Sequence, residues 1–366
     1  MSEEGTGAAS GDRGPEALDD PDHIRRVDAD GMLGHIAGLG AQLERGYATA
    51  SRTQELPSGE GVRSVVVCGM GGSGIAGDVL RSLYADRSRV PIVVSKGYVL
   101  PGFVGRDTIV VVLSYSGDTE ETLAAFDDAV RIGARVVAVS AGGELRIRAE
   151  EEGVPHIAVP TDVPMPRAAL GYLAAAPIGV LAAAEVIPSA ASAVAGTVSA
   201  LRTQADELAP SRPLGENGAK SVAAWIGHRT ALVWAPEGIG GTAALRWKNQ
   251  LNENAKVPAF VGTLPELDHN EIEGWSPGRG RGFAAIVLRP AHEPGWIGRR
   301  VSATLAAVEG SGLDAREVRA GEGSPMARLF SLTAMGDFVS AYLAVLQGVD
   351  PTPIPVLTKL KRELRA

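Results

Sequence analysis

The sequence predicts an α/β protein of two doubly wound domains, each a mainly parallel sheet flanked by helices. Short continuous runs of Val, Ile and Ala, such as Ser64–Cys68 and Thr108–Ser114, alternate with longer, partly polar segments of helical length. Uninterrupted apolar strands of this kind are typical of a parallel sheet that is covered on both faces. The chain has 366 residues, which is enough for two domains that each bury a core.

The same pattern assigns the elements in chain order. Residues 1–22 are rich in Gly, Ser, Pro and acidic groups, so we expect a disordered tail. An N-terminal domain is predicted over 23–187, a connecting helix and linker over 188–220, and a C-terminal domain over 221–366. The predicted strands are Ser64–Cys68, Pro91–Ser95, Thr108–Ser114, Arg135–Ser140, Thr230–Ala235, Val257–Gly262 and Ala284–Arg289. After the first strand of each half, GSGIAGDVLR (72–81) resembles GIGGTAALRW (238–247), which favours a duplicated unit.

Composition excludes several classes of protein. Asp and Glu number 43 against 35 Lys and Arg, an acidic balance that argues against nucleic-acid binding. The apolar stretch 168–184 contains Pro177 and is short for a membrane span, so we expect a buried helix there. One cysteine, Cys68, cannot form an intramolecular disulfide, and no leader pattern opens the chain, so we expect a cytoplasmic protein. The six histidines show no metal-ligand spacing, and no metal is predicted.

The segment GMGGSG (Gly69–Gly74) is the first candidate binding loop. It follows a predicted strand and leads into a helix, whose free N-terminal amides attract anions. Gly72 allows close backbone approach and the Ser73 hydroxyl can reach a phosphate oxygen. The glycines also satisfy GxGxxG, but a dinucleotide site would need an acidic residue where the next strand ends in Ser95. A purely structural glycine turn is the other alternative, and no GxSxG frame supports a serine hydrolase.

The segment SYSGDTEET (114–122) is the second candidate loop. It places the hydroxyls of Ser114, Ser116 and Thr119 between a predicted strand and a helix. Since the carboxyl ends of parallel strands share one edge of a sheet, both loops could hold a single phosphate dianion there. The alternative is that Ser116 or Asp118 only caps the helix.

The two loops resemble the phosphate-binding segments of the sugar isomerase (SIS) domain. Further segments resemble those of bifunctional phosphoglucose/phosphomannose isomerases: PRAALGYL (166–173), WKNQLNENAKVPAF (247–260), PELDHNEIEGW (265–275) and DPTPIPVLTKLK (350–361). The resemblance runs from about Val65 to the C terminus. It implies two SIS-type domains and a homodimer that interconverts fructose 6-phosphate with glucose 6-phosphate and mannose 6-phosphate through a cis-enediol, with no metal or cofactor.

The resemblance also implies roles for individual residues. Glu253 matches the base that carries a proton between C2 and C1, and His269 matches a ring-opening histidine donated across the dimer. Arg167 matches an arginine near the enediol oxygens, Thr352 a threonine beside C1–C2, and Lys359 a lysine lining the site. The structural alternatives are a solvated glutamate, a surface histidine, an arginine in a salt bridge near the hinge, and a lysine that is one more charge in the last helical turn.

Departures from the family pattern leave the substrate open. Asp118 and Asp268 stand where the family commonly has Asn, and a carboxylate at position 118 would weaken a bound phosphate unless it points away. The segment AGGELRIRAEEEG (141–153) is an unfamiliar version of its loop. The rival functions are a non-catalytic SIS-domain sugar-phosphate sensor and an SIS isomerase of another phosphosugar. A sensor needs the Ser and Thr loops but has no use for Glu253 and His269.

Overall fold

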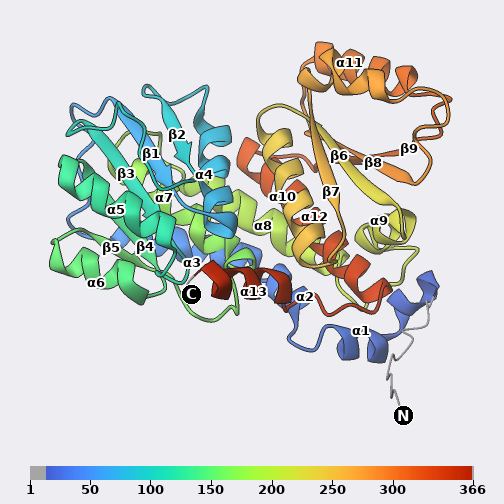
Figure 1. The fold of residues 1–366 in the computed structure, drawn as a ribbon, viewed down its shortest axis with the longest axis horizontal. Helices are drawn as coiled ribbons and strands as arrows, with labels where there is room; N and C mark the ends of the chain where they lie inside the picture. The colour runs from blue at the N-terminus through green and yellow to red at the C-terminus, as the bar shows by residue number, and fades with distance from the viewer. Residues whose placement is uncertain (1–13, 365–366) are drawn as a thin grey trace.

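A computed structural model describes residues 14–364 of the chain. Its first half is built on a five-stranded parallel sheet of order β2-β1-β3-β4-β5, and its second half on a four-stranded parallel sheet of order β7-β6-β8-β9 (Figure 1). The strands are β1 (Ser64–Cys68), β2 (Ile92–Ser95), β3 (Thr108–Leu113), β4 (Arg135–Ser140), β5 (His156–Ala158), β6 (Thr230–Pro236), β7 (Ala259–Leu264), β8 (Phe283–Arg289) and β9 (Asp314–Arg319).

Helices cover the sheets and fill the space between them. The helices are α1 (Pro21–Val27), α2 (Met32–Ala37), α3 (Leu39–Arg52), α4 (Gly71–Tyr84), α5 (Glu120–Ile132), α6 (Gly143–Glu151), α7 (Leu170–Ala183), α8 (Ala191–Glu207), α9 (Gly218–Ile226), α10 (Ile239–Glu253), α11 (Gly295–Ala307), α12 (Pro325–Leu346) and α13 (Pro355–Leu364). Short 3-10 turns are η1 (Pro15–Asp19), η2 (Pro166–Ala168), η3 (Glu266–His269) and η4 (Glu271–Gly274). The doubly wound α/β prediction is therefore confirmed.

Alternate residues of the central strands face two different apolar layers. Val65 and Val67 of β1 pack into a large core with α3, α4 and α7, whereas Val66 and Cys68 pack with α5 and α6 on the other face. The large core continues into the second half, where it includes α12. Because both faces of the sheet are buried, the strands carry no polar alternation, which explains their continuous apolar runs.

Two apolar helices lie deep in this core. The stretch 168–184 forms η2 and α7, a buried helix as predicted. Helix α12 is long and apolar enough to span a membrane, but 89% of its most apolar window is buried inside the molecule. Among the described residues it is the single helix that passes this length and hydropathy test. It occupies the position of a core helix, packed against α8, α9 and α10.

The disordered tail was expected over residues 1–22, but the last residues of this range are folded. Residues 15–19 form η1, in which Leu18 is fully buried, and α1 begins at Pro21. The Asp19 carboxylate accepts a hydrogen bond from buried Lys220 at 3.0 Å. The prediction rested on the average composition of residues 1–22, which does not show that one leucine and one ion pair can attach part of the segment to the core. Residues 1–13 of the expected tail lie outside the described residues.

The N-terminal domain expected over 23–187 is not separate from the second half, because its helices α1 and α2 pack against α12 of that half. Between the sheets, α8 lies in the segment 188–220 where a connecting helix was predicted. The two similar segments 72–81 and 238–247 fall on α4 and α10, which follow β1 and β6 at equivalent places of the two sheets.

Candidate active site

Both candidate phosphate loops lie at the carboxyl edge of the first sheet. Strands β1 and β3 are hydrogen-bonded neighbours, so the loops that follow them meet where the strand order reverses. Gly72 and Ser73 lie in the first turn of α4, and Thr119 is the residue before α5. The structure therefore brings Gly72, Ser73, Ser114, Ser116 and Thr119 to one edge, beside two helix N-termini that favour anions.

The serine hydroxyls of the two loops differ in burial and in the hydrogen bonds that they make within the protein. Ser73 is buried and its Oγ accepts the N–H of Tyr115 at 3.2 Å, which joins the two loops. Ser114 is also buried; its Oγ donates to Thr119 Oγ1 at 3.0 Å. Ser116 is exposed and its Oγ accepts only the N–H of Asp118, at 3.2 Å, within the described part of the chain. Ser116 is thus the serine most open to a ligand.

The Asp118 carboxylate is engaged away from the phosphate loop. Its Oδ1 accepts the N–H of Glu144 at 3.0 Å, at the start of α6. The unfamiliar segment after Ser140 supports this arrangement. A Cβ on Gly143, whose φ is +68°, would lie 2.3 Å from the Ser116 carbonyl oxygen, and one on Gly117 would lie 1.9 Å from that of Gly142. The two loops therefore interlock through glycines, and Asp118 caps α6.

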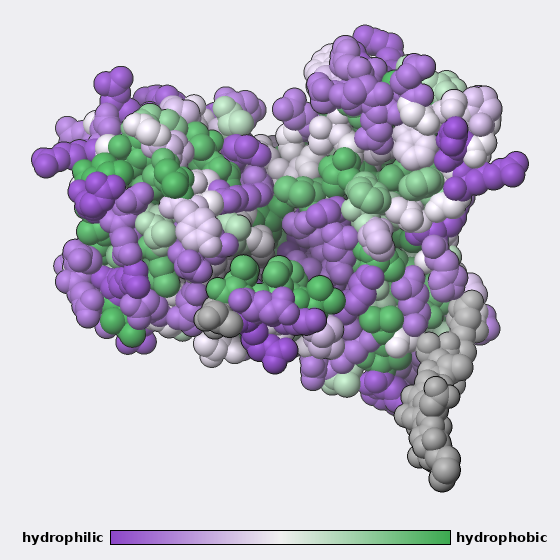
Figure 2. All heavy atoms as spheres, in the orientation of Figure 1, coloured by the Kyte–Doolittle hydropathy of each residue, from purple (hydrophilic) through white to green (hydrophobic). Residues whose placement is uncertain are grey.

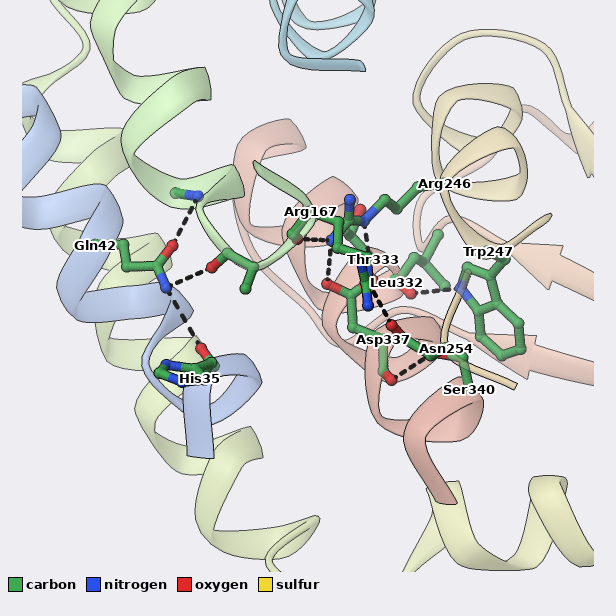
Figure 3. Close-up of polar contacts among 12 residues, drawn as sticks. His35, Gln42, Arg167, Arg246, Trp247, Asn254, Leu332, Thr333, Asp337 and Ser340 are labelled. Carbon is green, nitrogen blue, oxygen red and sulfur yellow. Dashed lines mark hydrogen bonds and ion pairs between the residues drawn. The ribbon is translucent and has the colours of Figure 1, made fainter. Parts of the chain in front are cut away.

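Arg167 lies in η2, at the start of the polypeptide segment that leads into α7. Its side chain is 2% exposed. Nε donates to Asn254 Oδ1 at 2.7 Å (Figure 3). Nη2 donates to the carbonyls of Pro351 and Thr352 at 2.8 and 2.6 Å. Burial lowers the pKa of the guanidinium to about 10, so it remains a cation at neutral pH.

Glu253 meets this cation from the other half of the molecule. It is the last residue of α10, its side chain is 26% exposed, and its Oε2 lies 3.6 Å from Arg167 Nη1. Arg246 lies two helical turns earlier on the same face of α10, because residues seven apart fall one above the other. A partly exposed carboxylate can accept and donate a proton, and a buried cation beside it can stabilise the negative charge that forms on a nearby substrate oxygen.

A buried polar network, which the sequence did not predict, holds the Arg167 segment. Arg246 Nη2 donates to the Arg167 carbonyl at 2.5 Å, and its Nε and Nη2 each lie 2.9 Å from an Asp337 oxygen (Figure 3). On the other side, Gln42 donates to the Ala168 carbonyl at 2.8 Å. Burial raises the pKa of the Asp337 carboxyl, and Arg246 opposes that shift. From the sequence, Arg246 could have been found because it lies seven residues before Glu253 on the same helix face. No local sequence pattern marks Gln42.

The first candidate phosphate loop packs against the segment that carries Arg167. A Cβ on Gly72 would lie 2.8 Å from the Pro166 carbonyl carbon and 2.9 Å from the Arg167 nitrogen, so the first loop packs directly on η2. Helix α4 also contacts α10. Figure 2 shows a hollow between the two halves of the molecule, with α13 along its lower rim.

His269 lies apart from this pair in the described chain. It is exposed in η3, and within residues 14–364 no hydrogen bond or ion pair joins it to Arg167 or Glu253. The neighbouring Asp268 anchors η3 to α11, since its oxygens lie 2.8 Å from both Arg300 Nη1 and Thr304 Oγ1. The aspartate at this position therefore has a structural role.

The two C-terminal candidate residues, Thr352 and Lys359, differ in burial and in whether a hydrogen bond links them to the Arg167–Glu253 pair. Thr352 is buried beside Arg167, which binds its carbonyl, and its Oγ1 has no hydrogen-bond partner among the described residues. Lys359 lies on α13 with its side chain 72% exposed, 3.8 Å from Glu363. Nothing in the described part of the chain links Lys359 by a hydrogen bond or ion pair to Arg167 or Glu253.

The molecule combines two doubly wound parallel sheets, hydroxyl-bearing loops at helix N-termini and an Arg–Glu pair between the halves, and comparisons with known proteins identify its class. The family model described as "Bacterial phospho-glucose isomerase C-terminal SIS domain" matches residues 215–364. A bifunctional phosphoglucose/phosphomannose isomerase of Caldicellulosiruptor bescii is 33% identical over 335 residues, covering 91% of this chain and 98% of the relative. The chain therefore belongs to the bifunctional phosphoglucose/phosphomannose isomerase family, whose members are isomerases.

Two further comparisons agree. The Aquifex aeolicus protein named bifunctional phosphoglucose/phosphomannose isomerase is 33% identical over 83% of this chain and 91% of its own. The crystal structure of a hypothetical protein from Thermus thermophilus superposes with a TM-score of 0.73 and 18% identity, covering 96% of both chains. At that identity the structural likeness supports the fold alone.

Proposed function

We propose that this isomerase interconverts fructose 6-phosphate with glucose 6-phosphate and with mannose 6-phosphate, through a cis-enediol and without a metal or cofactor. The observation that carries the proposal is the 3.6 Å approach of the Glu253 carboxylate to the buried Arg167 guanidinium, beside the two phosphate loops. The names of the Caldicellulosiruptor and Aquifex relatives supply the choice of hexose phosphates.

In the proposed reaction each group has one task. The phosphate loops, with Ser116 and the α4 and α5 N-termini, bind the dianion and so fix the sugar. Glu253 takes a proton from one of the two carbons C1 and C2 and returns it to the other. Arg167 lies where oxygen charge would develop on the enediolate, and its burial strengthens that interaction. The roles of Thr352 beside C1–C2 and of Lys359 in lining the site stay predictions.

The proposed active form is a cytoplasmic homodimer in which His269 of the partner subunit opens the sugar ring. Two features support it. His269 is exposed, and within the described residues no hydrogen bond or ion pair joins it to the Arg167–Glu253 pair. Helix α13 leaves Val356, Leu357, Leu360 and Leu364 exposed, and an apolar face of this kind is typical of a surface that another chain covers. Cys68 is free and buried, in keeping with a reducing compartment.

The decisive measurement is product identification. Chelator-treated protein is incubated with fructose 6-phosphate in deuterated water, and the aldoses are resolved and examined for label at C2. We expect labelled glucose 6-phosphate and mannose 6-phosphate. Binding without turnover would replace the isomerase with a sensor, and label at C2 would show that the transferred proton passes through a group that exchanges with solvent.

Glu253→Gln tests the base directly. The amide keeps the size of the side chain but cannot accept the proton, so we expect kcat to fall by about 10³-fold or more while KM changes little. Glu309→Gln, an exposed glutamate shortly after α11 and outside the candidate site, is the matched control. A kcat close to that of the wild type in Glu253→Gln would contradict the assignment.

A further inference from the structure

Lys256 stands three residues beyond Glu253 in an unusual backbone conformation. Its φ is +57°, the left-handed region that glycine normally occupies after a helix. A residue with a long side chain is disfavoured there unless its contacts compensate. The Lys256 side chain, which none of the steps above uses, therefore needs an explanation.

The ammonium of Lys256 is surrounded by main-chain oxygens. Its Nζ donates to the carbonyls of Glu253 at 2.8 Å, Asn254 at 3.1 Å, Asp350 at 2.8 Å and Pro351 at 3.0 Å. The first two belong to the C-terminal end of α10, where carbonyls lack helical partners. The other two belong to the segment that leads to Thr352. One side chain thus joins the end of the Glu253 helix to the 350–352 segment.

Arg167 binds the same segment from the opposite side, through the carbonyls of Pro351 and Thr352. The Pro351 carbonyl accepts from both cations. The positions of Arg167 and Glu253 are therefore coupled through 350–352 as well as through their direct contact. Since terminal helical residues fray, Glu253 in particular depends on what holds the end of α10.

We propose that Lys256 is a positioning residue of the isomerase, whose ammonium fastens the C-terminal end of α10 to the 350–352 segment and thereby keeps the Glu253 carboxylate beside Arg167. This inference rests on the proposed function in that Glu253 is taken as the base. Lys256 itself acts through Glu253 and touches no reacting atom.

The charge of Lys256 gives this role a pH dependence. Burial lowers the pKa of its amino group to about 8; Arg167 acts in the same direction, while Asp350 and Glu253 oppose it. These three are the charged groups that face it, from η2, from the segment after α12 and from α10. As pH rises through about 8, the ammonium becomes an amine with two donors, which weakens the attachment.

The test compares Lys256→Met and Lys256→Arg, with Lys248→Met on α10 as the matched control. For Lys256→Met we expect kcat on fructose 6-phosphate to fall about 10- to 100-fold with KM within about threefold, because the phosphate loops are untouched. In the wild type we expect kcat to fall as pH rises through about 8; Lys256→Arg should recover part of kcat and lack this fall, since a guanidinium does not titrate there. Lys248→Met should match the wild type.

Hydrogen exchange of the substrate-free proteins gives an independent readout. Lys256→Met should exchange faster in peptides covering 253–257 and 350–354 and unchanged in those covering 64–74. An unchanged kcat, or unchanged exchange in 350–354, would overturn the role of Lys256. If Lys256→Met fails to fold, the pH profiles of the wild type and Lys256→Arg decide the question, and identical alkaline limbs would overturn it.

The two proposals fail differently. A wild type that produces no aldose refutes the proposed function, while the exchange experiment still tests the attachment. An inactive Glu253→Gln together with a fully active Lys256→Met refutes the positioning role alone.

Discussion

At the scale of single residues, the serines of the two loops differ in exposure and in the hydrogen bonds that they already make. Ser116 is exposed and its hydroxyl is engaged only with the nearby N–H of Asp118 within the described chain. Ser73 is buried and also satisfies the N–H of Tyr115. Tyr115 in turn donates its hydroxyl to the Val163 carbonyl at 2.6 Å, which steadies the segment leading to Arg167. The loss of Ser73 should therefore affect both ligand and fold, and the loss of Ser116 only the ligand.

Ser116→Ala and Ser73→Ala test this separation. Removal of one hydrogen bond to a dianion should raise KM for fructose 6-phosphate about 10- to 100-fold in each, with a smaller effect on kcat. Ser73→Ala should also lose about 1–3 kcal/mol of unfolding free energy, because the Tyr115 N–H is left unpaired. Urea unfolding and steady-state kinetics measure the two effects, with Ser302→Ala on exposed α11 as control. Equal stability losses in both variants would refute the distinction.

At the scale of elements, equivalent loops of the two sheets have different chemistry. Around the α10 N-terminus, the hollow at the edge of the second sheet is lined by apolar side chains together with Glu237, His292, Glu293 and Arg328. Among the described residues its lining contains no Ser or Thr, so it lacks the hydroxyls that follow β1 and β3, and two carboxylates accompany its cationic groups. Of the two helices at equivalent places, α4 supplies the N-terminus that suits a phosphate, and α10 supplies Glu253 from its C-terminal end.

The interlock between the second phosphate loop and the start of α6 predicts the effect of Gly143→Ala. The new Cβ would lie 2.3 Å from the Ser116 carbonyl oxygen at a φ of +68°, so the loop must shift. We expect a stability loss of about 2 kcal/mol or more and a higher KM, with kcat less affected. Gly102→Ala, where nothing lies within 4 Å, is the control for both measurements. An unchanged KM in Gly143→Ala would show that this loop does not depend on α6.

Local sequence pattern predicted the strands that carry an apolar run and missed those that do not. All seven predicted strands occur; five are central in their sheets, where burial on both faces requires apolar residues, and two, β2 and β7, are edge strands that also carry apolar residues. The strands β5 (HIA) and β9 (DAREVR) carry no such run, since an edge strand tolerates polar and charged residues. At the site, the two loops were readable from local chemistry. The support from Gln42 and Asp337 arises only when distant helices pack, so no local pattern reveals it.

At the scale of the whole molecule, the candidate site depends on the joining of the two halves. The phosphate loops and Arg167 come from the first half, and Glu253 and Asn254 from the second. The buried Arg246–Asp337 pair ties α10 to α12 and binds the Arg167 carbonyl. A buried pair of this kind is costly to break, which favours one fixed arrangement of the halves. This arrangement leaves the proposed catalytic residue His269 exposed, with no hydrogen bond or ion pair to Arg167 or Glu253 in the described chain.

Subunit complementation tests whether His269 acts across a dimer. Glu253→Gln and His269→Ala are each expected to be inactive as homodimers. In a mixed dimer, one site would pair the intact Glu253 of the second variant with the intact His269 of the first. Random assembly makes half of the dimers mixed, each with one working site of two, so about a quarter of wild-type activity should return. Co-expression with two different tags and purification over both isolates the mixed dimer, whose activity should reach about half that of the wild type. If His269 served its own subunit, every site would lack one group and activity would stay at the level of the separate variants.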